Sequence, residues 1–219
     1  MFRYRSTTLL AILAALAAGC SATGTRAESA ATAGTPAAER SSASATGVPP
    51  RRELTAPQAV GGARQHTREG LAQRMGVQLA SLFADRSPTA VAAGFDINAP
   101  FYFAGINSPE PYPQDLAGQA DLALRAAPTA NSGTGSLTLV PAQDYASHDS
   151  TTALHCTVAT LRGSTASTDI PVCAWADGWT IGLVMDFSRK VETGQGEADL
   201  QGAADLTLAT RTAAARPAP

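Results

Sequence analysis

The segment 153–187 constrains the fold more than any other part of the sequence. Two runs rich in alternating apolar residues, PVCAWA and WTIGLVMDF, flank Asp177-Gly178. Asp-Gly in this position is typical of a two-residue turn between antiparallel strands. With these two residues as the turn, Val172 faces Leu183, and Ile181 shares the face of Leu183 because alternate residues of a strand point the same way. The segment therefore predicts a hairpin whose Leu183 face is buried.

The first twenty residues are typical of an export signal. Arg3 and Arg5 precede an uncharged apolar run, LLAILAALAA. Its length of about ten residues suits a signal peptide and is about half of what a membrane-spanning helix needs. The run ends in LAAGC, which resembles the lipobox of bacterial lipoproteins, although its leucine, Leu16, stands one place earlier than in that family.

The lipobox resemblance implies that residues 1–19 are a signal peptide and that Cys20 becomes the mature N-terminus, acylated with a diacylglyceryl group and palmitate-type chains. This interpretation places the protein on the extracytoplasmic side of the cell membrane, where the lipid anchors it. Ordinary signal-peptidase cleavage near Ala22 is the alternative, and it would leave the protein without a lipid.

Cysteine usage fits lipidation. The chain has three cysteines, and an odd number in an exported protein leaves one thiol to explain. If Cys20 carries lipid, Cys156 and Cys173 remain as an even pair in an oxidising compartment. Directly opposed cysteines on antiparallel neighbours meet the Cα separation of a disulfide. That register sets two further pairs: Leu154 beside Trp175, and Val158 beside Pro171.

Composition divides the rest of the chain. Residues 20–54 begin with the expected lipidated Cys20 and continue as Ala, Ser, Thr, Gly and Pro without apolar periodicity, which predicts a disordered tether. Residues 55–212 are the expected folded domain, and 213–219 read as a disordered tail. The net charge of −2 at pH 7 argues against a nucleic-acid partner, because nothing in the overall charge attracts phosphates.

Local patterns predict the remaining elements. The expected elements are a helix over 67–84 with a stripe of Leu71, Met75, Leu79 and Leu82, a hairpin joining 91–97 to 101–106, a helix over 113–127, a short strand over 136–142 and a helix over 196–212. We expect the last helix to cover the Leu183 face. The fold class is therefore α+β: a single small domain with an antiparallel sheet, a C-terminal three-stranded meander, helices mainly on one face and one disulfide.

Residues around the hairpin resemble a group of uncharacterised exported or lipid-anchored proteins of high-GC Gram-positive bacteria. The shared residues are Cys156, Pro171, Val172, Cys173, Trp175, Ala176, Asp177 and Gly182, with an upstream P-x-x-V-G-G over 57–62. The group has no assigned activity. The resemblance therefore implies the disulfide and the architecture, and it implies no catalytic residue.

Motifs for catalysis, cofactors or metals are missing from the sequence. His66, His148 and His155 have no G-x-S-x-G serine to act on, and we interpret them as solvated or structural. Cys156, Cys173 and His155 lack the spacing of metal ligands. We therefore predict no catalytic, cofactor-binding or metal-binding residue.

An apolar strip follows from the disulfide register. Leu154, Val158, Trp175 and Val184 lie on the face opposite Leu183. Either another element covers the strip, with Trp175 packed on the disulfide, or the strip is an exposed interaction patch for a partner.

These features predict a cell-surface lipoprotein with a non-enzymatic role as an interaction or accessory module, whose partner is a protein or a cell-wall component. One alternative is an extracytoplasmic hydrolase with a dispersed site, for which a pocket would join His148 or His155 to a serine and a carboxylate. The other is a small-ligand or inhibitor-binding domain, which would have an apolar cavity without such groups.

Overall fold

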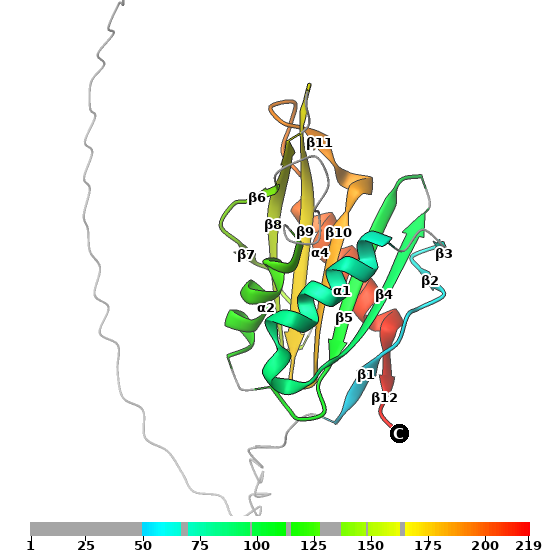
Figure 1. Cartoon of the computed structure of the whole chain (residues 1–219). Helices are drawn as coiled ribbons and strands as arrows, with labels where there is room; N and C mark the ends of the chain where they lie inside the picture. Colours follow the sequence, from blue (N-terminus) through cyan, green and yellow to red (C-terminus); the bar gives the residue numbers. More distant parts are fainter. Residues whose placement is uncertain are drawn as a thin grey trace, which may run out of the picture. The chain divides into compact units, whose positions relative to one another are not determined.

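The computed structural model describes residues 50–66, 70–96, 98–112, 115–127, 137–147, 149–162 and 165–219. They form a ten-stranded antiparallel sheet with helices on both faces, and a separate two-stranded ribbon of β1 and β12 (Figure 1). The order along the sheet is β2-β3-β4-β5-β10-β9-β8-β6, while β11 pairs with β9 and β7 with β8. The predicted α+β class, the C-terminal meander and the single disulfide are confirmed.

The helices and strands have the following bounds. The strands are β1 (Arg52–Leu54), β2 (Ala59–Val60), β3 (Ala63–His66), β4 (Thr89–Asp96), β5 (Pro100–Asn107), β6 (Leu137–Leu139), β7 (Gln143–Asp144), β8 (Thr152–Arg162), β9 (Ser167–Asp177), β10 (Thr180–Asp186), β11 (Val191–Glu192) and β12 (Ala215–Pro217). The helices are α1 (Gly70–Leu82), α2 (Leu116–Leu124) and α4 (Leu200–Ala214), with the short 3-10 turns η1 (Ala84–Arg86) and η2 (Phe187–Arg189).

Two of these helices, α1 and α2, pack on the predicted buried face of the hairpin. Met75 and Leu79 of α1 join the same core cluster as Ile181 and Leu183 of β10. The predicted stripe of α1 is only partly right, because Leu82 is 36% exposed. The β4–β5 hairpin and the strand β6 lie where the sequence predicted them.

The last helix, α4, lies on the opposite face of the sheet, so the prediction that it covers Leu183 is wrong (Figure 1). Its buried side chains are small, with Ala203, Ala204 and Ala214 packed toward the disulfide and Trp175. Thr207 and Thr210 are also buried on this helix. Their hydroxyls donate to the backbone oxygens of Ala203 and Leu206, both at 2.8 Å, which removes the cost of burying them.

The β8–β9 ladder has the register that the disulfide predicted. Cys156 faces Cys173 and is bonded to it, Leu154 faces Trp175, and Val158 faces Pro171. In the β9–β10 ladder Leu183 instead faces Ala174, so the predicted register is wrong by two residues. The turn consists of Gly178 and Trp179, because Asp177 remains in the strand and its Oδ1 accepts hydrogen bonds from the backbone N–H groups of Trp179 and Thr180. A shift of two preserves the buried face.

Two glycines explain how bulky side chains fit on the α4 face of the central strands. Gly182 faces Trp175 across the β9–β10 ladder and Gly105 across the β5–β10 ladder. A Cβ on Gly182 would lie 2.1 Å from the Trp175 ring, and one on Gly105 would lie 2.6 Å from Leu54 Cδ1. The missing side chains therefore leave a trough in which the indole and Leu54 lie. Trp175 also stacks on Phe103 at a ring separation of 5.8 Å.

The ribbon joins the two ends of the described domain. Arg52, Glu53 and Leu54 of β1 pair with Pro217, Arg216 and Ala215 of β12. The expectation of a disordered tail over 213–219 is therefore wrong, and the domain begins before residue 55. Pro217 is tolerated because the ribbon is only two strands wide and its outer edge needs no donor. The signal peptide, Cys20 and most of the expected tether lie outside the described residues.

Loss of the disulfide should destabilise the domain strongly. In the double variant Cys156→Ala/Cys173→Ala we expect the free energy of unfolding to fall by about 3 kcal/mol, the chain-entropy value for a loop of this length. Urea unfolding of both proteins measures the difference. As a control, reduced wild type should unfold at a urea concentration close to that of the double variant; a wild type that is equally stable with and without reductant would contradict the prediction.

Candidate functional site

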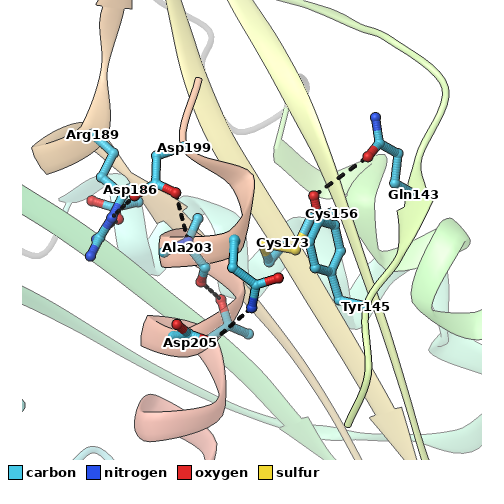
Figure 2. The surroundings of a disulfide bond; sticks show 12 residues. Gln143, Tyr145, Cys156, Cys173, Asp186, Arg189, Asp199, Ala203 and Asp205 are labelled. Atoms are coloured by element: carbon cyan, nitrogen blue, oxygen red, sulfur yellow. Dashed lines mark hydrogen bonds and ion pairs between the residues drawn. A yellow bond between two sulfur atoms is a disulfide. The ribbon is translucent and has the colours of Figure 1, made fainter. Parts of the chain in front are cut away.

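The predicted interaction patch is not a surface in the described part of the chain. Trp175 is 0% exposed, and Leu154 and Val184 are each 1% exposed. They lie beneath α4 beside the disulfide, as Figure 2 shows for the cysteines and Ala203. Val158 is partly exposed at the far end of the strip. Leu154, Trp175 and Val184 therefore belong to a second hydrophobic core, and the exposed-patch interpretation is wrong for these three residues.

His155 lies on the other face of β8, as alternation from Cys156 requires, and both of its ring nitrogens contact carboxylates. Nδ1 lies 2.6 Å from Asp121 Oδ1 of α2, and Nε2 lies 2.8 Å from Asp144 Oδ1 of β7. A general base needs a free ring nitrogen to accept a proton. With both nitrogens engaged, His155 serves to tie α2 and β7 to the sheet.

Of the other two histidines, only His66 is among the described residues. His66 packs edge-on against Tyr102 with the ring centres 6.0 Å apart. His148 lies outside the described residues. The hydrolase alternative therefore gains no support from His155 or His66.

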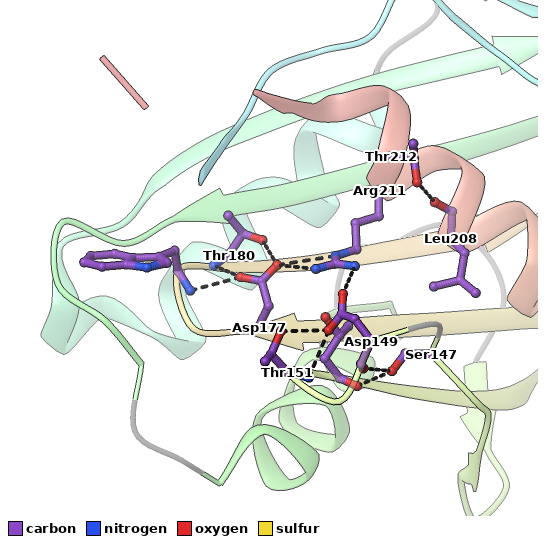
Figure 3. A network of polar contacts seen from close by, with 10 residues as sticks. Ser147, Asp149, Thr151, Asp177, Thr180, Leu208, Arg211 and Thr212 are labelled. Carbon is purple, nitrogen blue, oxygen red and sulfur yellow. Dashed lines mark hydrogen bonds and ion pairs between the residues drawn. The ribbon is translucent and has the colours of Figure 1, made fainter. Parts of the chain in front are cut away.

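A polar network lies at the end of the sheet where the β9–β10 hairpin turns (Figure 3). Arg211, near the C-terminal end of α4, donates from Nη2 to Asp177 Oδ2 at 3.1 Å and from Nη1 to Asp149 Oδ2 at 3.0 Å. Thr180 Oγ1 donates to the same Asp177 oxygen at 2.9 Å. The network thus joins α4, the hairpin and the loop before β8.

The pKa of Asp149 is lowered within this network. Burial acts to raise its pKa, but hydrogen bonds from Thr151 and Arg211 and the charge of the guanidinium outweigh burial and lower the pKa to about 2. The Thr151 N–H and hydroxyl both donate to Asp149 Oδ1, at 2.9 Å and 2.7 Å. Asp149 therefore stays ionised at neutral pH, and so it cannot donate a proton there.

A polar hollow of about 200 Å³ opens beside the network. Its lining residues are Pro50, Arg52, Asp149, Thr151, Asp177, Trp179 and Arg211. The carboxylates of Asp149 and Asp177 are turned to Arg211, so their hydrogen-bonding capacity is largely used within the protein. Among the other lining residues, Arg52 is exposed to solvent and Trp179 is partly exposed.

A second hollow, of about 410 Å³, lies beside η2 and α4. It is lined mainly by apolar residues, among them Val60, Phe101 and Leu206, with Arg189 at one side. Arg189 donates to the fully buried Asp186 at 2.6 Å and to Asp199, the N-cap of α4, at 3.1 Å (Figure 2). The guanidinium is thus held between two carboxylates and fastens α4 to the end of β10.

Within the described ranges no cluster of His, Cys, Asp and Glu is arranged to hold a metal ion. Likewise, no helix among the described residues has the length and apolarity to span a membrane. Comparisons with protein-family models, curated proteins and solved structures find no match to this chain.

Sequence reasoning missed the network. It assigned Asp177 to the turn itself and gave Asp149 and Arg211 no role. These two residues are separated by 62 positions, and no spacing pattern links a loop aspartate to an arginine in a distant helix.

We expect the Arg211–Asp149–Asp177 network to contribute a pH-dependent share of stability. Because the folded-state pKa of Asp149 lies below the ordinary value of 3.8, its contribution is complete above about pH 4 and is lost as the pH falls toward 2. Arg211→Met should lower the free energy of unfolding by about 2 kcal/mol at pH 7, since it leaves the buried Asp177 carboxylate without its cation.

Urea unfolding at pH 7 and pH 3 measures both effects. The difference in the free energy of unfolding between wild type and Arg211→Met should be smaller at pH 3 than at pH 7. Asp149, which is partly exposed, should account for about 1 kcal/mol of this decrease. Arg162→Met, at an exposed position of β8, is the matched control and should change little at either pH. An equal effect of the two substitutions would contradict this account.

Proposed function

We propose that this protein is a lipid-anchored module on the extracytoplasmic side of the cell membrane, with a non-enzymatic interaction or accessory role. The domain is attached to its anchor through the tether expected over residues 20–54, the last three residues of which form β1. The proposal joins the export signal of the sequence to the disposition of the three cysteines.

The observation that carries the proposal is the disulfide. Cys156 and Cys173 are bonded to each other in the core beneath α4, and disulfides persist in oxidising compartments outside the cytoplasm. The chain contains three cysteines, so Cys20 is the one that this bond does not use. It is also the cysteine of the lipobox-like motif, where a thiol is required for acylation.

The chemistry of the polar clusters supports a binding role over a catalytic one. His155 has a carboxylate on each ring nitrogen, and Asp149 and Asp177 share the guanidinium of Arg211. Arg189 is likewise held between Asp186 and Asp199. Groups held in mutual pairs stabilise the fold, whereas a general acid or base must be able to exchange a proton with a substrate.

The mass of the intact protein from the membrane fraction tests the anchor and the disulfide together. We expect a chain that begins at Cys20 and carries the added mass of a diacylglyceryl group. Thiol alkylation should label no cysteine before reduction and two cysteines, Cys156 and Cys173, after reduction, because the lipidated thiol cannot react.

Cys20→Ser is the control for this measurement. The variant should lose both the lipid mass and the membrane association, while it retains the disulfide and the folded domain. A wild-type protein that is recovered unmodified from the medium, or cut near Ala22, would refute the anchor. Free Cys156 and Cys173 in the unreduced protein would refute the oxidising location.

A further inference from the structure

The β1–β12 ribbon and the residue before it carry three exposed arginines that have no role in the core. Arg51, Arg52 and Arg216 are exposed, whereas Leu54 on the inner side is 2% exposed. The ribbon borders a shallow hollow of about 330 Å³, lined by Pro50, Arg51, Arg52, Ala215, Arg216 and Pro217. All three arginines thus line this hollow.

The charge of this surface differs from that of the whole chain. The ribbon and its flank, residues 50–54 and 215–219, contain three arginines and a single acid, Glu53, and hence a net charge of +2. The chain as a whole has a net charge of −2. Glu53 pairs with Arg51 at 2.9 Å, and the nearby carboxylates of Asp149 and Asp177 are turned to Arg211. Arg216 lies across the ladder from Glu53 and donates to the Ala215 carbonyl at 2.8 Å, but among the described residues neither Arg52 nor Arg216 forms an ion pair, so their charges remain to attract an external anion.

An aromatic side chain lies beside the arginines. The guanidinium carbon of Arg51 is 5.7 Å from the centre of the Trp179 ring, and Trp179 is at the tip of the β9–β10 hairpin, where it is partly exposed. Tryptophan is enriched at the membrane–water interface, where the indole favours the headgroup region, and the arginine guanidinium binds phosphate bidentately. A groove for a free anion would not need an indole beside the arginines.

The position of the ribbon in the chain indicates that the surface it would bind is the membrane. β1 is the first element of the domain, so the expected tether from Cys20 joins the domain at this ribbon. A flexible tether of this length has a mean reach of roughly 30 Å, which keeps the ribbon at high effective concentration next to the bilayer. We propose that Arg51, Arg52, Arg216 and Trp179 dock the domain on anionic phospholipid headgroups. This inference rests on the lipid anchor proposed above, and it adds the orientation of the domain on the membrane.

Binding to vesicles by a protein that lacks the lipid tests the docking alone. The full chain from residue 20, with Cys20→Ser, is mixed with vesicles of phosphatidylcholine or of phosphatidylcholine with phosphatidylglycerol. We expect sedimentation with the anionic vesicles only, and release when the salt concentration is raised. Each basic residue at such a surface contributes about fivefold to affinity, so R51Q/R52Q/R216Q should weaken binding by about a hundredfold.

A second triple variant separates a docking surface from net charge. R64Q/R162Q/K190Q removes the same charge from exposed positions of β3, of β8 and after η2, and it should leave vesicle binding unchanged. Urea unfolding of both triple variants should match that of the parent, which shows that the ribbon is intact. Trp179 emission should shift to shorter wavelength on anionic vesicles as the ring leaves water.

Four results would overturn the proposal: no binding to anionic vesicles, equal binding to both vesicle types, equal loss in the two triple variants, or competition by millimolar inorganic phosphate at constant ionic strength. The last result would assign the groove to a free anion. Failure of the anchor would appear in the mass of the native protein, whereas failure of the docking would appear only in this assay, so the two can be told apart.

Discussion

The pairing of β8 with β9 is the constraint from which most of the structure follows. The two strands run opposite each other for eleven residues each, and the Cys156–Cys173 bond fixes their register. Because strand side chains alternate between faces, this register decides what each face receives. It sets Trp175 on the α4 side, His155 on the α2 side and Asp177 at the end of the ladder, where Arg211 reaches it. A shift of one residue would exchange the two faces.

The two faces of the sheet accept helices by different means. On one face α1 and α2 pack through side chains such as Met75 and Leu79, which bury large apolar areas. On the other face the trough over Gly105 and Gly182 is already filled by Trp175 and Leu54, so α4 contributes small residues. Alanine and internally bonded threonine let the α4 backbone lie close to the strands. Alanine, which is abundant in this chain, thus occupies the positions where little space remains between α4 and the sheet.

The sequence predicted what is determined by alternation and covalent geometry. The β8–β9 register follows from two cysteines that must face each other, and the α+β class follows from the alternating runs and the helical stripes. The β9–β10 register was wrong because the Asp177 side chain binds the turn N–H groups from within the strand. The prediction of the sheet face that α4 covers was wrong, because the buried positions of this helix include Thr207 and Thr210. The polarity of these two side chains is satisfied only by hydrogen bonds to the helix itself. The strand β12 was missed because Ala-Arg-Pro has no alternation of apolar and polar residues. The polar network was missed because its members are distant in sequence.

The attachment of β1 fixes the N-terminal end of the described domain to the sheet. Asn107, at the end of the central strand β5, accepts from the Leu54 N–H through Oδ1 at 2.6 Å and donates through Nδ2 to the Leu54 carbonyl at 3.0 Å. The Leu54 side chain fills the space above Gly105 in the same strand, while β12 pairs with β1 along its other side. A pull on the chain at Pro50 is therefore resisted by β5 in the middle of the sheet, where neighbouring strands pair on both sides. Strands at the centre of a sheet open less readily than edges, so the point of attachment is among the parts of the fold that local unfolding reaches last.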